Sequence, residues 1–136
     1  MLRNRPLRFA LITAAALLAV PAVPAGATPR TAPPAAALVL TGNPGEAVTP
    51  AAKWVLLTCG PNGGTHPAPG ASCSALAATG GSISTLRLDR DAICPMIYDP
   101  VTVSATGVWQ GRRIREQITF PNRCVLIAET GPVFGF

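Results

Sequence analysis

Four cysteines constrain the fold of this chain more than any other feature of its sequence. They occur at Cys59, Cys73, Cys94 and Cys124. An even number of cysteines in a small exported domain is typical of a disulfide framework, here of two bridges. Three pairings are possible, and we favour Cys59–Cys73 with Cys94–Cys124, because the first pair brackets one short loop rich in glycine and proline. A zinc site is the less favoured alternative, since the chain has no C-x-x-C pair.

The first 27 residues have the pattern of a secretory signal peptide. Three arginines, at positions 3, 5 and 8, precede a 12-residue apolar run over 9–20 and a small-x-small cleavage site at 25–27. The apolar run is shorter than the roughly 18 to 20 residues that span a bilayer, so we expect no membrane partner. The sequence therefore predicts a signal peptide over 1–27, a flexible tail over 28–36 and one folded domain over 37–136, secreted from the cell.

The charge of the predicted mature chain, 28–136, does not favour a nucleic-acid partner. Its eight basic and six acidic residues leave a net charge of +2, against +5 for the whole sequence. A nucleic-acid-binding domain normally keeps a concentrated basic face. The arginine run GRRIRE, at 111–116, has no aromatic residue interleaved with it, and a solvated sheet face is the favoured interpretation. On a strand the run alternates, with Arg113, Arg115 and Gln117 on one face and Arg112, Ile114 and Glu116 on the other.

Hydrophobic patterns and turn residues predict an α+β fold with an antiparallel sheet. The expected strands are 37–41, 53–59, 100–105, 108–120 and 133–136. The expected helices are 72–79, with Ser72 as N-cap, and 123–129, with Asn122 as N-cap. A turn near Thr106-Gly107 joins two of the strands, and residues 83–90 are ambiguous. Residues 60–70 hold too many glycines and prolines for regular structure.

Histidine gives no support for a catalytic site. The chain has one histidine, His66, which lies in the Gly/Pro loop and is expected at the surface. A Ser-His-Asp triad needs a base held by a buried carboxylate, and no G-x-S-x-G motif is present. The sequence also shows no obvious pair of catalytic carboxylates and no phosphate-binding loop. We therefore expect neither an enzyme nor a bound metal or cofactor.

The most unusual stretch is ICPMIYDP, at 93–100. Its large apolar residues, 96–98, lie between a cysteine and a proline. Pro95 fixes its own φ and biases Cys94 toward an extended conformation. As a core strand the stretch is short and interrupted by proline at both ends. As an exposed loop it is a rigid apolar projection, which fits a protease cleft as a substrate does and loses little conformational entropy on docking.

Eight short segments, taken in order along the predicted mature chain, resemble one known family. They are ALVLT (37–41), LTCGP (57–61), GTHPAPGASC (64–73), LAATGG (76–81), CPMIYDPV (94–101), GVWQGRR (107–113), NRC (122–124) and VFGF (133–136). With the four cysteines, they make the chain similar to the Streptomyces subtilisin inhibitor family. The resemblance implies an α+β fold with a five-stranded antiparallel sheet and two short helices. It also implies a homodimer formed through the sheets and tight, reversible inhibition of extracellular subtilisin-like serine proteases.

The resemblance also implies roles for single residues. The scissile bond is Met96–Ile97, and Met96 is P1, the residue that enters the specificity pocket of the protease. Asn122 is expected either to hydrogen-bond the loop backbone or simply to cap the next helix. The other protease contacts that the resemblance implies are Ile93 (P4), Cys94 (P3), Pro95 (P2), Tyr98 (P2′) and Asp99.

Two departures from the family pattern bear on function. Isoleucine stands at P1′ where valine is commoner, and at P4 in place of methionine, which leaves the preferred protease open. A non-inhibitory secreted binding domain on the same fold is the alternative function. Survival of the Met96–Ile97 bond in excess protease distinguishes the two.

Overall fold

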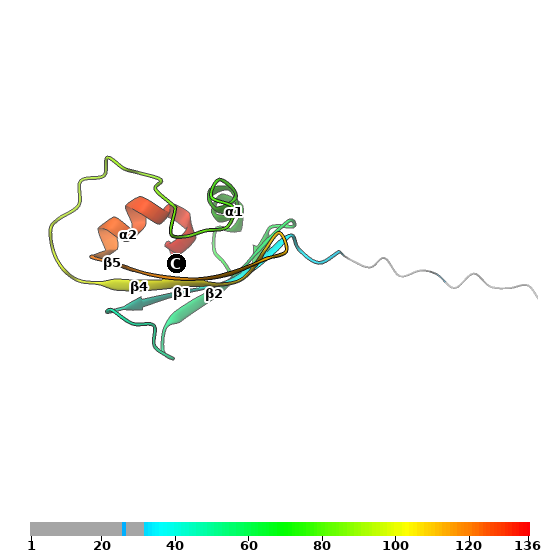
Figure 1. Cartoon of the computed structure of the whole chain (residues 1–136), viewed down its shortest axis with the longest axis horizontal. Helices are drawn as coiled ribbons and strands as arrows, with labels where there is room; N and C mark the ends of the chain where they lie inside the picture. The colour runs from blue at the N-terminus through cyan, green and yellow to red at the C-terminus, as the bar shows by residue number, and fades with distance from the viewer. Residues whose placement is uncertain (1–25, 27–31) are drawn as a thin grey trace, which may run out of the picture. The chain divides into compact units, whose positions relative to one another are not determined.

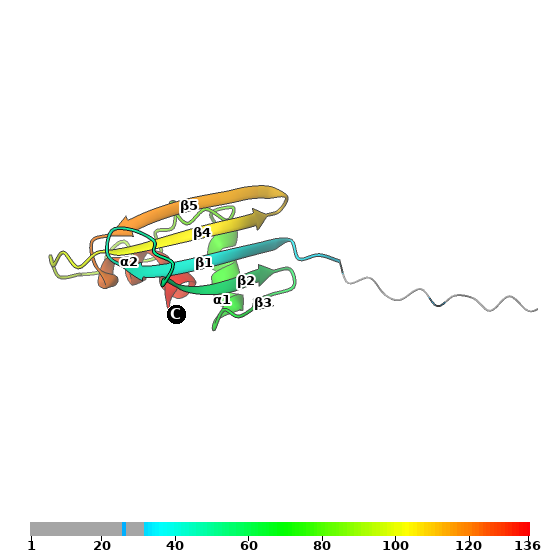
Figure 2. The same cartoon turned by 90° about the horizontal axis from the view of Figure 1, so that it is seen from below.

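One antiparallel sheet forms the frame of the domain (Figure 2). The computed structural model describes residue 26 and residues 32–136, so the predicted signal peptide lies outside the described residues except for Gly26, and so does the predicted tail over 28–31. The strands stand in the order β3-β2-β1-β4-β5, with every pair of neighbours antiparallel. Their bounds are Ala36–Pro44 (β1), Lys53–Cys59 (β2), Gly63–Gly64 (β3), Val101–Trp109 (β4) and Arg112–Phe120 (β5).

Two short helices cover one face of this sheet, as Figure 1 shows. They are α1 (Pro69–Ala77) and α2 (Arg123–Thr130), and a 3-10 helix (Gly131–Phe134) follows α2. Alternate residues of a strand point to the same face, and the covered face carries Leu38, Leu40, Val55, Leu57, Val103 and Ala105, all buried. Each fully buried aliphatic side chain stabilises the fold by roughly 1.5–3 kcal/mol. The predicted α+β class, with five strands and two helices, is confirmed.

Helix α1 begins three residues earlier than predicted. It starts at Pro69 rather than Ser72 and makes no side-chain N-cap hydrogen bond. Proline suits the first helical position, because the N–H that it lacks has no partner there in any case. Ser72 instead lies inside the helix, fully buried, where its hydroxyl donates to the Pro132 carbonyl at 3.2 Å. The predicted cap is therefore wrong.

The hairpin between β4 and β5 turns at Gln110-Gly111, so the predicted turn at Thr106-Gly107 is also wrong. Gln110 has φ 47° and Gly111 has φ 79°, which is the left-handed pair that a tight two-residue hairpin needs. Gly107 lies within β4, where a Cβ atom would collide with the carbonyl oxygen of Ala37 on β1. Glycine at this position therefore allows β1 and β4 to approach closely, and it does not mark a chain reversal.

Three other segments differ from or sharpen the sequence expectations. Residues 60–70 contribute a short strand after all, because Gly63–Gly64 pairs with the end of β2 at the sheet edge. The strand predicted over 133–136 is wrong, since the 3-10 helix buries the side chains of positions 133 and 134 against the core. Residues 83–90 form turns and bends rather than a helix.

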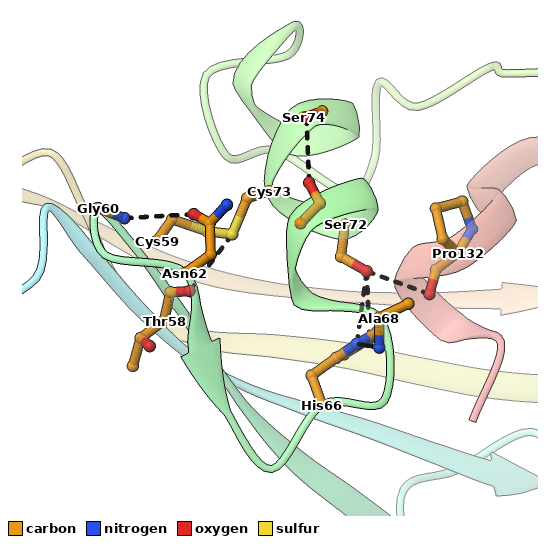
Figure 3. Close-up of a disulfide and its surroundings, with 11 residues drawn as sticks. Thr58, Cys59, Gly60, Asn62, His66, Ala68, Ser72, Cys73, Ser74 and Pro132 are labelled. Atoms are coloured by element: carbon orange, nitrogen blue, oxygen red, sulfur yellow. Dashed lines mark hydrogen bonds between the residues drawn. A yellow bond between two sulfur atoms is a disulfide. The ribbon is translucent and has the colours of Figure 1, made fainter.

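A disulfide and a buried histidine fix the connection from β2 to α1 (Figure 3). Cys59 and Cys73 are joined as predicted, with their Cα atoms 5.7 Å apart. His66 is only 5% exposed, so its predicted surface position is wrong. Its Nε2 donates to the Val133 carbonyl at 3.0 Å, and its Nδ1 accepts from the Ala68 N–H at 3.0 Å. Both ring nitrogens thus have structural partners, and His66 ties this connection to the C-terminal segment.

Candidate functional site

An extended loop, residues 91–100, bows out from the domain before β4 begins (Figure 1). We call it the exposed loop. Met96 is completely exposed, and Ile93 is 98%, Ile97 61% and Tyr98 67% exposed. Large apolar side chains are usually buried, and a row of them in water marks a surface that another molecule covers.

A disulfide fixes the first half of the exposed loop to the helix layer. Cys94 and Cys124 are joined as predicted, with an S–S distance of 2.06 Å and Cα atoms 5.6 Å apart. Cys124 lies in the first turn of α2, and Leu126 in the same helix is 2% exposed and packs in the core. The loop is therefore attached to an element that cannot move without disturbing the core.

The side chain of Asn122 hydrogen-bonds the backbone at the centre of the exposed loop. It is 7% exposed, and its Nδ2 donates to the carbonyls of Pro95 and Ile97, both at 3.0 Å. These two carbonyls lie on either side of the Met96–Ile97 peptide bond. The Oδ1 atom of the same side chain accepts from the Val125 N–H at 3.0 Å and caps α2. The two alternatives for Asn122 are thus not exclusive, because one amide makes both sets of hydrogen bonds.

Backbone hydrogen bonds to α2 hold the segment that leads into the exposed loop. The Leu88 N–H donates to the Glu129 carbonyl at 3.1 Å, and the Asp89 N–H donates to the Ala128 carbonyl at 2.9 Å. Arg87 and Glu129 also form an ion pair at 3.2 Å. An exposed ion pair of this kind contributes at most about 1 kcal/mol, so the two backbone hydrogen bonds define where the loop starts.

Two hydrogen bonds hold the C-terminal end of the exposed loop. One is between backbone groups, and the other involves the side chain of Glu46, which sequence analysis did not identify. The Asp99 N–H donates to the Pro121 carbonyl at 2.9 Å. The Tyr98 hydroxyl donates a hydrogen bond to the Glu46 carboxylate. This bond, with smaller contributions from desolvation and from the negative charge, raises the pKa of Tyr98 above its ordinary value of 10.0. Only the fold brings these two residues together, since they are 52 positions apart.

The described part of the site consists of exposed backbone with large apolar side chains. Within the part of the chain that the structure describes, no three His, Cys, Asp or Glu side chains are grouped to hold a metal ion. No helix among residues 32–136 is long and apolar enough to cross a membrane. What the loop presents is an extended backbone with its large side chains outward, which can lie in a cleft as an added strand does.

Comparison with known proteins places this geometry in a family. Residues 34–122 match the family model described as subtilisin inhibitor-like. Subtilisin inhibitor-like protein 5 of Streptomyces fradiae is 52% identical over 103 residues, which cover 74% of this chain and 96% of that protein. The subtilisin inhibitor of Streptomyces albogriseolus is 42% identical over 136 residues, with 98% and 92% covered.

A solved structure has the same fold. Streptomyces caespitosus sermetstatin, in complex with Bacillus licheniformis subtilisin, superposes with a TM-score of 0.60 at 40% sequence identity. The match covers 74% of this chain and 98% of that chain. From the family model, the sequence relatives and this fold, the chain belongs to the subtilisin inhibitor-like family, whose members are protease inhibitors rather than enzymes.

Proposed function

We propose that the protein is a secreted inhibitor of subtilisin-like serine proteases, to which it binds through the exposed loop as a substrate would. The observation that carries the proposal is the pair of hydrogen bonds from Asn122 to the carbonyls of Pro95 and Ile97. A loop that merely lies at the surface needs no brace on both sides of one peptide bond. The sermetstatin complex supports the proposal, because that relative was solved with subtilisin bound.

Met96 is the P1 residue in this proposal, and Met96–Ile97 is the scissile bond. The exposed Met96 side chain is free to enter an apolar specificity pocket, and Ile93 at P4 is a second apolar anchor. Burial of each is worth roughly 1.5–3 kcal/mol, and a few buried anchors usually carry most of the binding energy of an interface. The remaining protease contacts are Cys94 (P3), Pro95 (P2), Tyr98 (P2′) and Asp99.

Inhibition then follows from slow, reversible proteolysis. The protease serine attacks the carbonyl carbon of Met96, the bond to Ile97 breaks, and the Ile97 nitrogen takes a proton and becomes a free amine. In an ordinary substrate this amine diffuses away, and water then releases the acyl group. Here the Cys94–Cys124 bridge holds one side of the break and Asn122 holds the other. The amine therefore stays within reach and re-forms the peptide bond.

The scissile bond can be identified directly. The oxidised protein is incubated with a catalytic amount of subtilisin, and the new N-terminus is sequenced. We expect one cut, which begins a new chain at Ile97, and a lasting mixture of cut and intact protein. Cleavage at several bonds, or complete digestion, contradicts the proposal and favours a non-inhibitory domain.

The two functions of Asn122 can be separated with a matched pair of variants. Asn122→Ser keeps a side-chain oxygen that can cap α2, whereas Asn122→Ala loses it, and neither can reach both loop carbonyls. Two hydrogen bonds are worth about 2 kcal/mol together, so we expect both variants to be hydrolysed at Met96–Ile97 roughly 30-fold faster in the complex. Thermal unfolding reports the cap separately, and Asn122→Ala is expected to be the less stable variant. Wild-type hydrolysis rates in both would show that the brace has no function.

We also propose that the protein forms a homodimer through the outer face of the sheet. Val39 (40% exposed), Trp54 (61%) and Val108 (42%) lie on β1, β2 and β4. The strand register places them on one face, opposite to the face that the helices cover. Such an apolar patch can pack against the same patch of a second copy about a two-fold axis, which is the arrangement of an isologous interface.

The dimer is tested by the charge variant Trp54→Asp. A central tryptophan of an interface typically contributes about 2 kcal/mol or more, so the dimer dissociation constant should rise on the order of 30-fold. Light scattering after size exclusion measures it, and Thr85→Asp, an exposed position outside the sheet, is the control. A monomeric wild type, or a Trp54→Asp variant that dimerises normally, contradicts this interface.

We propose that the chain is exported with loss of residues 1–27. Its two disulfides support an oxidising destination. Expression in a secreting host tests the proposal, and the protein recovered from the medium should begin at Thr28. Retention of the whole chain inside the cell contradicts it.

A further inference from the structure

The loop that follows β1 reaches the C-terminal half of the exposed loop and brings a carboxylate to it. The Tyr98 hydroxyl donates to Oε1 of Glu46. Tyr98 comes directly after Ile97, so this contact lies one residue beyond the proposed scissile bond. None of the functions proposed above uses Glu46.

The backbone that carries Glu46 is held by buried partners. The Gly45 N–H donates to the Pro100 carbonyl at 2.7 Å, and the Thr102 hydroxyl donates to the Gly45 carbonyl at 2.7 Å. Thr102 is fully buried in β4, and the Thr119 hydroxyl lies 2.8 Å from its oxygen. Glu46 is thus attached to the start of β4, just where the exposed loop ends.

A second buried side chain closes the same turn. Asn43 is 7% exposed, and its Nδ2 donates to the carbonyls of Pro44 and Ala47, both at 2.6 Å. Its Oδ1 accepts from the Thr49 hydroxyl at 2.8 Å. These bonds enclose position 46, so its backbone cannot shift without breaking hydrogen bonds of a buried group, which is costly.

We infer that Glu46 is a positioning residue, which holds Tyr98 so that the amine of Ile97 stays aligned for religation after the bond is cut. The inference rests on the proposed function. Side chains then hold the exposed loop near its start, at its centre and beyond the scissile bond: the disulfide at Cys94, Asn122 on both sides of the scissile bond, and Glu46 beyond it.

The charge states of the two partners agree with this brace. A neutral phenol donates to an ionised carboxylate, and the raised pKa of Tyr98 reflects that preference. A group whose pKa is raised by folding keeps its interaction below its ordinary pKa, here near 10, and loses it as the pH rises through the raised value. The brace is therefore complete at neutral pH and is lost in alkali.

The contact can be measured in the free protein, because Tyr98 is the only tyrosine of the chain. Alkaline titration followed by tyrosinate absorbance should give a lower midpoint for Glu46→Gln than for wild type. Glu129→Gln removes the same charge from an ion pair with Arg87 and should leave the midpoint unchanged. An unchanged midpoint in Glu46→Gln overturns the inference and leaves the proposed function untouched.

The consequence for inhibition is measured by a double-mutant cycle. Glu46→Ala, which removes the acceptor that glutamine would keep, and Tyr98→Phe should each speed hydrolysis of Met96–Ile97 in the complex about fivefold, the effect of one hydrogen bond. In the double variant the rate should equal that of Tyr98→Phe alone, because the two changes remove one interaction.

Other outcomes of the cycle identify what has failed. Additive effects would mean that Glu46 acts on the protease rather than through Tyr98, which overturns the inference. Unchanged rates in both single variants overturn it as well. If the wild type does not inhibit subtilisin, the proposed function fails, and the tyrosine titration still decides whether Glu46 holds Tyr98.

Discussion

Removal of the Cys94–Cys124 bridge, by Cys94→Ser and Cys124→Ser together, should convert the protein from an inhibitor into a substrate of subtilisin. The bridge ties Cys94, the proposed P3 residue, to the first turn of α2. Without it the acyl half of the cut loop can swing away from the Ile97 amine, so religation no longer competes with hydrolysis. Loss of alignment by about 1 Å can cost 10²-fold in rate, and we expect net hydrolysis of Met96–Ile97 to rise by on the order of 10²-fold.

The second bridge provides a matched control. Cys59→Ser with Cys73→Ser removes a disulfide of similar geometry that lies between β2 and α1. Each double variant should lose about 3 kcal/mol of unfolding free energy, as disulfide removal typically costs. The control variant, assayed below its unfolding temperature, should still inhibit. Equal loss of inhibition in both variants would mean that general stability, rather than the loop anchor, governs the rate of cleavage.

Met96→Asp should abolish inhibition of subtilisin. P1 side chains enter an apolar pocket, and an unpaired carboxylate there costs several kcal/mol of desolvation. The expected rise in inhibition constant is therefore on the order of 10³-fold or more, since about 1.4 kcal/mol corresponds to a factor of ten. Met96 is completely exposed in the free protein, so the fold should be unaffected. Met96→Leu, of similar volume, should inhibit nearly as wild type.

A lysine at position 96 should change which proteases the protein inhibits. Trypsin-like proteases carry an aspartate in the specificity pocket and require lysine or arginine at P1. Met96→Lys should therefore inhibit trypsin more strongly than the wild type does, as measured by titration of tryptic activity. A variant with no gain would show that Met96 is not P1, even if subtilisin inhibition were lost.

Local patterns in the sequence predicted the features that depend on neighbouring residues. Asn122 precedes a helix-forming segment and caps it, because the N-cap bond joins residues only three apart. The strand over 37–41 could be predicted because it is a short apolar run, and its Leu38 and Leu40 are buried in the core. The extended loop followed from Pro95, whose restraint on its own φ and on Cys94 is local.

Apart from the two disulfides, several features that depend on distant residues could not be predicted. His66 was expected at the surface because its neighbours are loop formers, but its partner Val133 is 67 positions away. Gly107 resembled a turn residue, and only the register of β1 against β4 shows that it makes room for a carbonyl. The contact of Glu46 with Tyr98 also joins residues far apart in the sequence, and no local pattern identifies either residue as a partner.

Titration of a fixed amount of subtilisin with the oxidised 28–136 protein is the most direct test of the central claim. Residual peptidase activity should fall linearly to zero at one inhibitor chain per protease, and Met96–Ile97 should stay largely intact in the complex. Unchanged activity together with rapid, complete cleavage of the loop would contradict the account. The family fold would then serve a different partner.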